Sequence, residues 1–197
     1  MPKLPQSFYT NPDVVQVAKE LIGCKLCTQI NGIKTTGIIV ETEAYNGRTD
    51  KACHAYLNKR TNRTKVMYQE GGIAYVYFVY GMHYLFNVVT NKENYADAVL
   101  VRAIEPTDGL EEMYLRRKMT KNGKLLTGGP ARLAQALGID KQLNEENLDS
   151  DVIWIEPRSI DFNANIDASK RIGVDYAGSD AELPWRFSII GNKFVSK

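Results

Sequence analysis

Residues 75–89 read YVYFVYGMHYLFNVV, two aromatic and β-branched runs on either side of Gly81-Met82. Residues of these types favour β-strands, and a glycine at the first central position suits a two-residue hairpin turn. The pattern therefore predicts an antiparallel hairpin in which Tyr80 pairs with His83 at the tip. Such a hairpin would expose tyrosine side chains next to a tight turn.

Upstream of the hairpin, residues 39–45 read IVETEAY, a strand-like run that ends in carboxylates. Successive side chains of a strand point to opposite faces, so Glu41, Glu43 and Tyr45 are expected on one face. Acids at a strand end are most often solvated, but two carboxylates this close repel each other unless one is protonated or a cation neutralises them. A carboxylate near a tyrosine-rich hairpin favours an enzyme that handles a flat, unstacked ring.

The remaining chain mixes strand and helix signals without a regular alternation. Further strands are predicted at residues 35–43, 98–104, 152–156 and 186–190. One helix is predicted to open at Asn11-Pro12, with Pro12 as its first residue, another at the helix-start pair Asp108 and Glu111, and a third at residues 130–138. Strands dominate, so we expect an α+β fold: a single domain over residues 1–197 with a largely antiparallel β-sheet, surrounding helices and a protruding β-hairpin.

The composition is that of an ordinary globular protein, with 44% hydrophobic residues, 24% charged residues and a net charge of +2 over 197 residues. No apolar run is long enough to cross a bilayer, and the first residues lack the apolar stretch of a secretory signal. The cysteines Cys24, Cys27 and Cys53 are odd in number and form no disulfide pattern, which fits a reducing compartment. We expect an intracellular protein, cytoplasmic if bacterial and nuclear if eukaryotic.

The charges are unevenly distributed along the chain. Residues 59–65 carry four basic groups and residues 116–124 carry five, both without an acid, whereas residues 140–151 carry five acids and one lysine. Each cluster taken alone is most simply a solvated face. Two basic segments with a separate acidic one also suit a surface that contacts phosphates on one side.

Together these features resemble one known family, the alkyladenine (3-methyladenine) DNA glycosylases of the single-domain type. Similar motifs are the segment ETEAY, the tyrosine-rich hairpin, residues 61–63 (TNR), residues 128–133 (GGPARL) and residues 184–187 (PWRF). The resemblance implies a monofunctional enzyme that flips an alkylated or deaminated purine out of double-stranded DNA. It would then hydrolyse the N-glycosidic bond with a Glu-activated water and so start base excision repair. The resemblance implies a monomer that needs no cofactor and no membrane.

The resemblance also assigns roles to individual residues. It implies that Glu43 is the general base, that Arg102 lies beside the catalytic water and that the backbone carbonyl of Ile172 holds this water. The base pocket would be formed by Tyr45, His54, Tyr77 and Asn87. Tyr80 would be the DNA intercalation residue, wedged into the gap that the flipped nucleotide leaves. Asn87 would exclude normal guanine by clashing with its 2-amino group.

Arg102 interrupts the apolar run AVLVRAI at residues 98–104. A charge in a buried strand needs a carboxylate partner, and we expect Glu43 as the first choice and Glu41 as the second.

The hairpin register conflicts with the assigned pocket. Pairing Tyr80 with His83 puts Asn87 opposite Val76, on the face away from Tyr77, so both pocket residues can line one cavity only if a bulge or strong twist intervenes. A second departure is Thr64, because Asn usually stands at this position in the family motif.

Other classes of protein fit less well. Cys24-x-x-Cys27 with Cys53-His54 matches no standard zinc spacing, so no metal is expected. The alternative function is a non-catalytic nucleic-acid-binding module, since the family fold is similar to the C-terminal domain of a formyltransferase that acts on initiator tRNA. Such a module would need the basic segments but not Glu43, Arg102 and a hairpin-tip tyrosine together. The sequence does not rank 3-methyladenine, 7-methylguanine, hypoxanthine and ethenoadenine as substrates.

Overall fold

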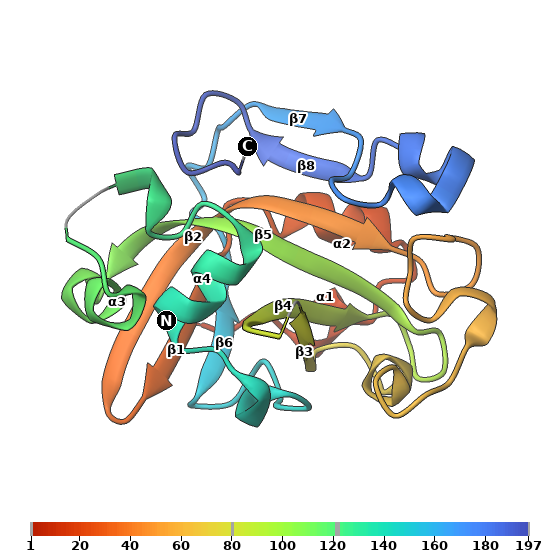
Figure 1. Cartoon of the computed structure of the whole chain (residues 1–197), viewed down its shortest axis with the longest axis horizontal. Coiled ribbons are helices and arrows are strands. Elements are labelled where there is room, and N and C mark those ends of the chain that lie inside the picture. The colour runs from red at the N-terminus through yellow and green to blue at the C-terminus, as the bar shows by residue number, and fades with distance from the viewer. Residues whose placement is uncertain (1, 80, 121–122, 197) are drawn as a thin grey trace.

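Strand β2 (Ile33–Tyr45) is the longest element of the described chain and lies in the middle of the sheet (Figure 1). The computed structural model describes residues 2–79, 81–120 and 123–196. The other strands within these ranges are β1 (Lys25–Ile30), β3 (Ala74–Val79), β4 (His83–Thr90), β5 (Asp97–Asp108), β6 (Ile153–Glu156), β7 (Ile166–Ser169) and β8 (Arg186–Ile189). They form one antiparallel sheet in the order β3-β4-β5-β2-β1-β6, and β8 joins β2 to β7. The predicted α+β class with a largely antiparallel sheet is confirmed.

Strand β2 changes its partner along one of its sides. Residues Ile33–Ile38 pair with β1, and residues Glu41–Glu43 pair with β8, while β5 pairs on the other side. The register against β5 shifts between Ile39 and Thr42, and such bulges bend a strand and increase its twist. The acidic end of β2 is therefore enclosed by strands on both sides.

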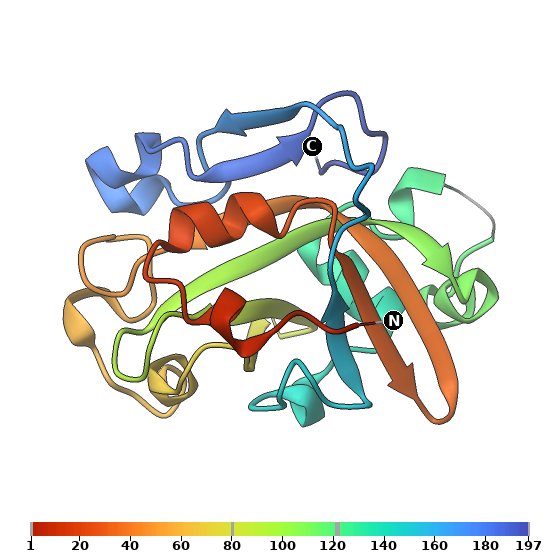
Figure 2. The ribbon, with the colours of Figure 1, turned by 180° about the vertical axis from the view of Figure 1, so that it is seen from behind.

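Helices cover both faces of the sheet (Figures 1 and 2). Helices α1 (Gln6–Tyr9) and α2 (Val14–Glu20) lie on one face, and α4 (Pro130–Leu137) lies on the other with α3 (Leu110–Arg117) packed against it. Short 3₁₀ helices lie in the connections: η1 (Tyr56–Asn58), η2 (Lys65–Tyr68), η3 (Gly123–Leu125), η4 (Lys141–Leu143) and η5 (Asp175–Glu182). None of the helices in the described ranges combines the length and the apolarity that a bilayer-crossing segment needs.

Two predicted helix starts differ from the structure. Helix α2 is capped by Asp13, whose carboxylate accepts hydrogen bonds from two backbone N–H groups, so it begins two residues later than Pro12 predicts. Helix α3 follows Gly109, which has a positive φ of 75° and makes no side-chain cap. Asp108 instead accepts a hydrogen bond from the Thr36 hydroxyl on β2, so pairing between strands replaces the predicted capping pair.

The β3–β4 hairpin has a different register from the predicted one. The register pairs Val79 with His83, Tyr77 with Leu85 and Tyr75 with Asn87. Three residues thus connect the strands, and Gly81 among them has a φ of 69°, a conformation that glycine adopts without strain. The predicted pairing of Tyr80 with His83 is wrong by one residue. A one-residue shift turns every side chain of a strand to the other face, so Tyr77 and Asn87 share a face without a bulge.

Candidate active site

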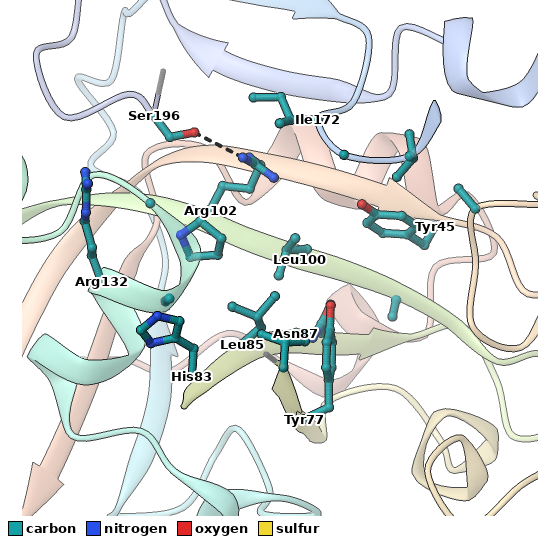
Figure 3. Close-up of a pocket in the computed structure, with 18 of the residues that line it drawn as sticks. Tyr45, Tyr77, His83, Leu85, Asn87, Leu100, Arg102, Arg132, Ile172 and Ser196 are labelled. Atoms are coloured by element: carbon teal, nitrogen blue, oxygen red, sulfur yellow. Dashed lines mark hydrogen bonds between the residues drawn. The ribbon is translucent and has the colours of Figure 1, made fainter. Parts of the chain in front are cut away.

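A cavity of about 1010 Å³ lies between the end of β2, the β3–β4 hairpin and residues 192–196 (Figure 3). Its lining includes Leu85, Asn87, Leu100, Arg102, Ile172 and Ser196. Figure 3 shows Tyr45 and Tyr77 on one side of the cavity and His83 and Arg132 on the other. Aromatic walls with a few polar groups are typical of pockets that bind small organic ligands.

Glu43 lies just beneath this lining and is fully buried. Its Oε2 accepts a hydrogen bond from the Tyr45 hydroxyl at 2.7 Å, and its Oε1 accepts one from the backbone N–H of Ile172 at 2.8 Å. Arg102 Nη1 lies 3.2 Å from the same Oε1. All three donors belong to residues that line the cavity, so the walls of the cavity themselves fix the carboxylate.

The Tyr45 hydroxyl is a stable donor to this carboxylate. Burial raises the pKa of Tyr45 well above its usual value, and the nearby charge of Glu43 raises it further. The hydroxyl therefore keeps its proton at neutral pH and continues to donate.

Arg102 divides its guanidinium between two buried carboxylates. Its Nε donates to Glu41 Oε1 at 2.9 Å, while its Nη1 contacts Glu43 at 3.2 Å. The prediction that Arg102 finds a carboxylate is confirmed, but the predicted order of partners is reversed because Glu41 makes the shorter contact. Burial lowers the pKa of Arg102, but the charges of Glu43 and Glu41 outweigh burial and raise it, so the guanidinium stays charged.

Tyr77 and Asn87 both line the cavity, as the observed register requires. The Asn87 Nδ2 donates to the backbone carbonyl of Tyr75 at 3.1 Å, directly across the hairpin. This bond holds the carboxamide in one orientation. Tyr75 is 2% exposed and packs at a tilt against Tyr77, with ring centroids 5.1 Å apart.

His54 packs edge-to-face against Tyr77, with ring centroids 4.8 Å apart. Its Nδ1 lies 3.0 Å from the Tyr75 hydroxyl, and its Nε2 lies 3.0 Å from Arg63 Nη2. Because a guanidinium only donates, Nε2 is the acceptor and Nδ1 carries the hydrogen. Burial, followed by the charge of Arg63, lowers the pKa of His54 to about 4, so the ring is neutral at pH 7.

A buried ion pair that sequence reasoning missed holds the loop of Ile172 in place. Arg171 and Asp50 are 4% and 1% exposed and form a bidentate pair. Arg171 also donates to the Ala44 carbonyl at 2.8 Å and lies over the Tyr45 ring, 4.8 Å from its centroid. The pair thus ties the loop to the end of β2 and brings the Ile172 N–H to Glu43. The two residues are 121 positions apart, and no local pattern links them.

The structure brings together every predicted site residue that it describes. Ile172 is 39% exposed and reaches Glu43 through its N–H, whereas the resemblance had assigned a role to its carbonyl. The predicted intercalation residue, Tyr80, lies outside the described residues. Within the described residues no three His, Cys, Asp or Glu side chains are grouped so as to hold a metal ion.

The fold and the site together define an α+β enzyme in which an aromatic cavity meets a buried, hydrogen-bonded carboxylate. Comparison with known proteins gives the family. The family model described as methylpurine-DNA glycosylase (MPG) matches residues 7–193, and the chain belongs to this family. It is therefore a DNA glycosylase, a hydrolase of N-glycosyl bonds, and the non-catalytic alternative is not supported.

Several bacterial relatives are similar over nearly their whole length. A protein of Chlamydia felis is 50% identical over 185 residues, which cover 93% of this chain and 94% of the relative. A protein of Natranaerobius thermophilus is 47% identical over 196 residues, and one of Bacillus cereus is 46% identical over 202 residues, each covering 98% of both chains. All three carry the provisional name 3-methyladenine DNA glycosylase.

Proposed function

We propose that this glycosylase releases alkylated and deaminated purines from double-stranded DNA, as a monomer and through one domain over residues 1–197, with Glu43 as its general base. The observation that carries the proposal is the buried carboxylate of Glu43, held by three donors beneath an aromatic cavity. A carboxylate offers about four acceptor positions, so three donors leave one for a water molecule.

Hydrolysis of the N-glycosidic bond requires a water molecule and a carboxylate that can take its proton. The bond between C1′ of the sugar and the purine nitrogen breaks, and its electron pair leaves with the base. Positive charge develops on the sugar, which the negative charge of Glu43 stabilises. The water oxygen bonds to C1′ while Glu43 takes the water proton. Arg102 and the backbone of Ile172 would keep the water in line.

The cavity suits a purine that has left the duplex. Chemistry at C1′ requires the nucleotide to leave the stack, at a cost of a few kcal/mol. The rings of Tyr45, Tyr77 and His54 offer flat faces and edges that can repay part of this cost by packing on the base. Asn87, fixed by its bond across the hairpin, is proposed to exclude the 2-amino group of guanine. Tyr80 is proposed to fill the gap in the stack.

Exposed cations at the cavity support a duplex as the substrate. Arg63, Arg132 and Lys193 all line the cavity and are exposed. Phosphates flanking a flipped nucleotide would meet these side chains, and such contacts supply most of the sequence-independent affinity for DNA.

The decisive variant is Glu43→Gln, which keeps the shape of the side chain but cannot take the water proton. Base release under single-turnover conditions should fall about 10²–10⁴-fold. Binding to the same lesion duplexes, measured by fluorescence anisotropy, should remain close to that of the wild type. Duplexes with one 7-methylguanine, hypoxanthine or ethenoadenine each should all be substrates of the wild-type protein.

A wild-type rate in Glu43→Gln would reject Glu43 as the general base. Release of 7-methylguanine without release of hypoxanthine or ethenoadenine would restrict the proposed substrates to alkylated purines that carry a positive charge.

A further inference from the structure

Glu41 is a fully buried carboxylate that does not line the cavity. It accepts four hydrogen bonds: from Arg102 Nε at 2.9 Å, Arg186 Nε at 2.7 Å, the Ser196 N–H at 2.7 Å and the Ser196 hydroxyl at 2.8 Å. Three of these donors reach Oε1 and the Ser196 N–H reaches Oε2, so both oxygens of the carboxylate are held. Nothing in the proposed reaction uses this carboxylate directly.

We propose that Glu41 is a positioning residue that holds the guanidinium of Arg102 back from Glu43, so that Glu43 retains an acceptor position and enough negative charge to take the proton from water. This inference rests on the proposed role of Glu43 as the general base.

The geometry of Arg102 is the first argument. Arginine commonly binds one carboxylate in a bidentate manner, with two parallel N–H donors, and this is the strongest form of the arginine–carboxylate ion pair. Here the fork is split, because Nε donates to Glu41 and only Nη1 contacts Glu43, at the longer distance of 3.2 Å. With a neutral residue at position 41, Arg102 would be free to close on Glu43 with two donors and occupy the position that the water needs.

Charge balance is the second argument. Glu41 and Glu43 together face two guanidinium groups, Arg102 and Arg186, while Arg171 is paired with Asp50. Loss of the Glu41 charge would leave two positive groups around one carboxylate. Since the transition state gains positive charge on the sugar, this surplus would oppose the reaction.

Ser196 makes the arrangement rigid. Its N–H and hydroxyl both donate to Glu41, and the hydroxyl also accepts from Arg102 Nη2 at 3.3 Å. Arg186 is held in turn by the Ser169 hydroxyl, at 3.1 Å from its Nη1. Residues 192–196 and strand β8 therefore lock the Arg102 side chain from the side opposite Glu43.

The test is Glu41→Gln, which removes the charge and keeps the shape. Single-turnover base release at pH 7 should fall roughly 10²-fold, the size of effect that a misplaced group commonly causes. The acid limb of the pH–rate profile should move to lower pH, because Glu43 in closer contact with Arg102 gives up its charge less readily. A purely structural role would lower the rate without moving this limb.

The charged and titratable groups near Glu43 must be considered in this comparison. They are Glu41 and Tyr45 on β2, Tyr77 on β3, Arg102 on β5, Arg171 in the loop before η5 and Arg186 on β8. Among these groups only Glu41 differs between the wild type and Glu41→Gln, so a displaced acid limb in that variant is attributable to the change at position 41.

Glu156→Gln is the matched control. Glu156 is also a buried glutamate of the sheet, 3% exposed, and accepts a hydrogen bond from Trp154 Nε1 at 3.1 Å, but it is not part of the cavity lining. Its variant should keep the wild-type rate and acid limb. Ser196→Ala, a milder change, should move the acid limb in the same direction as Glu41→Gln by a smaller amount, and it serves if Glu41→Gln does not fold.

The experiment distinguishes failure of the role proposed for Glu41 from failure of the role proposed for Glu43. A wild-type rate and pH profile in Glu41→Gln, with an inactive Glu43→Gln, would overturn this inference and leave the proposed function intact. An acid limb that stays in place in both Glu41→Gln and Ser196→Ala would also overturn it. Full activity of Glu43→Gln would overturn both proposals together.

Discussion

At the residue scale, His54 in the cavity wall makes the stability of the folded protein depend on pH. Its ring is held between Arg63 and the Tyr75 hydroxyl, and its pKa is lowered from 6.5 to about 4 by burial and by Arg63. Between these two values the unfolded chain binds a proton that the folded chain does not. Stability is therefore lost as the pH falls from about 6.5 towards about 4, and it is independent of this group above that window.

We expect His54→Gln to flatten this part of the stability curve. The wild-type protein should lose about 1–3 kcal/mol of unfolding free energy to this group across the window, after allowance for solvent screening of the partly exposed ring. Urea unfolding at several pH values from 7 to 4.5, with and without the substitution, measures the difference. Parallel curves for the two proteins would show that His54 is not the group responsible.

Also at the residue scale, the sequence predicted that Arg102 contacts a carboxylate, but it did not predict which of the two carboxylates makes the shorter contact. The charge of Arg102 in an apolar strand required a carboxylate, and one was found. Which of two neighbouring carboxylates makes the shorter contact depends on tenths of an ångström and on Ser196, which lies 155 positions from Glu41. Local patterns carry no information about such contacts.

At the scale of the element, the β3–β4 hairpin separates the protein core from the cavity. Phe86 is fully buried in the main hydrophobic cluster, while its neighbour Leu85 lines the cavity. The two side chains point to opposite faces of one strand. The hairpin thus contributes to stability with one face and to substrate binding with the other.

Alanine substitutions at these adjacent positions should separate the two contributions. Phe86→Ala should cost about 3–5 kcal/mol of stability, as expected for an aromatic side chain removed from a core. Leu85→Ala should cost clearly less stability but alter the single-turnover rate of base release. Equal losses of stability in denaturant titrations would contradict the assignment of the two faces.

The same hairpin shows why element boundaries were predicted better than register. Alternating aromatic and β-branched residues located both strands, and Gly81 located the turn. The choice between a two-residue and a three-residue connection decides which face each side chain occupies. A glycine in a left-handed conformation suits both connections, so the local sequence does not determine the length of the turn. Packing of the hairpin against β5 and the cavity determines it.

At the scale of the whole molecule, all three cysteines are buried. Burial raises the pKa of Cys24 to about 11 and those of Cys27 and Cys53 to about 12. Since the thiolate is the reactive form, none should react with a chromogenic disulfide reagent at pH 8 in the folded protein. All three should react in denaturant.

Cys53 makes this measurement informative about the site, because it lines the cavity while remaining 5% exposed. Rapid modification of Cys53 in the folded protein, located by peptide mapping, would indicate that the wall formed by residues 52–54 opens readily. Cys24, which is also buried, should stay unlabelled with and without lesion DNA.

The class of the whole fold could be predicted because strands dominate and no regular alternation with helices occurs. The cavity could not be predicted as a whole, since its walls come from segments that are far apart in the sequence. The pair of Arg171 with Asp50 and the contact of Ser196 with Glu41 both span more than 120 positions. Neither contact can be read from a local pattern in the sequence.

Residues 192–196 line the cavity and Ser196 makes two of the four hydrogen bonds to Glu41, and this has a consequence for synthesis. A ribosome makes these residues last among all those that build the site. The core strands can pair while translation continues, but Arg102 finds its final arrangement only when residue 196 has emerged. The nascent protein thus completes its catalytic centre only after the last of these residues has been made.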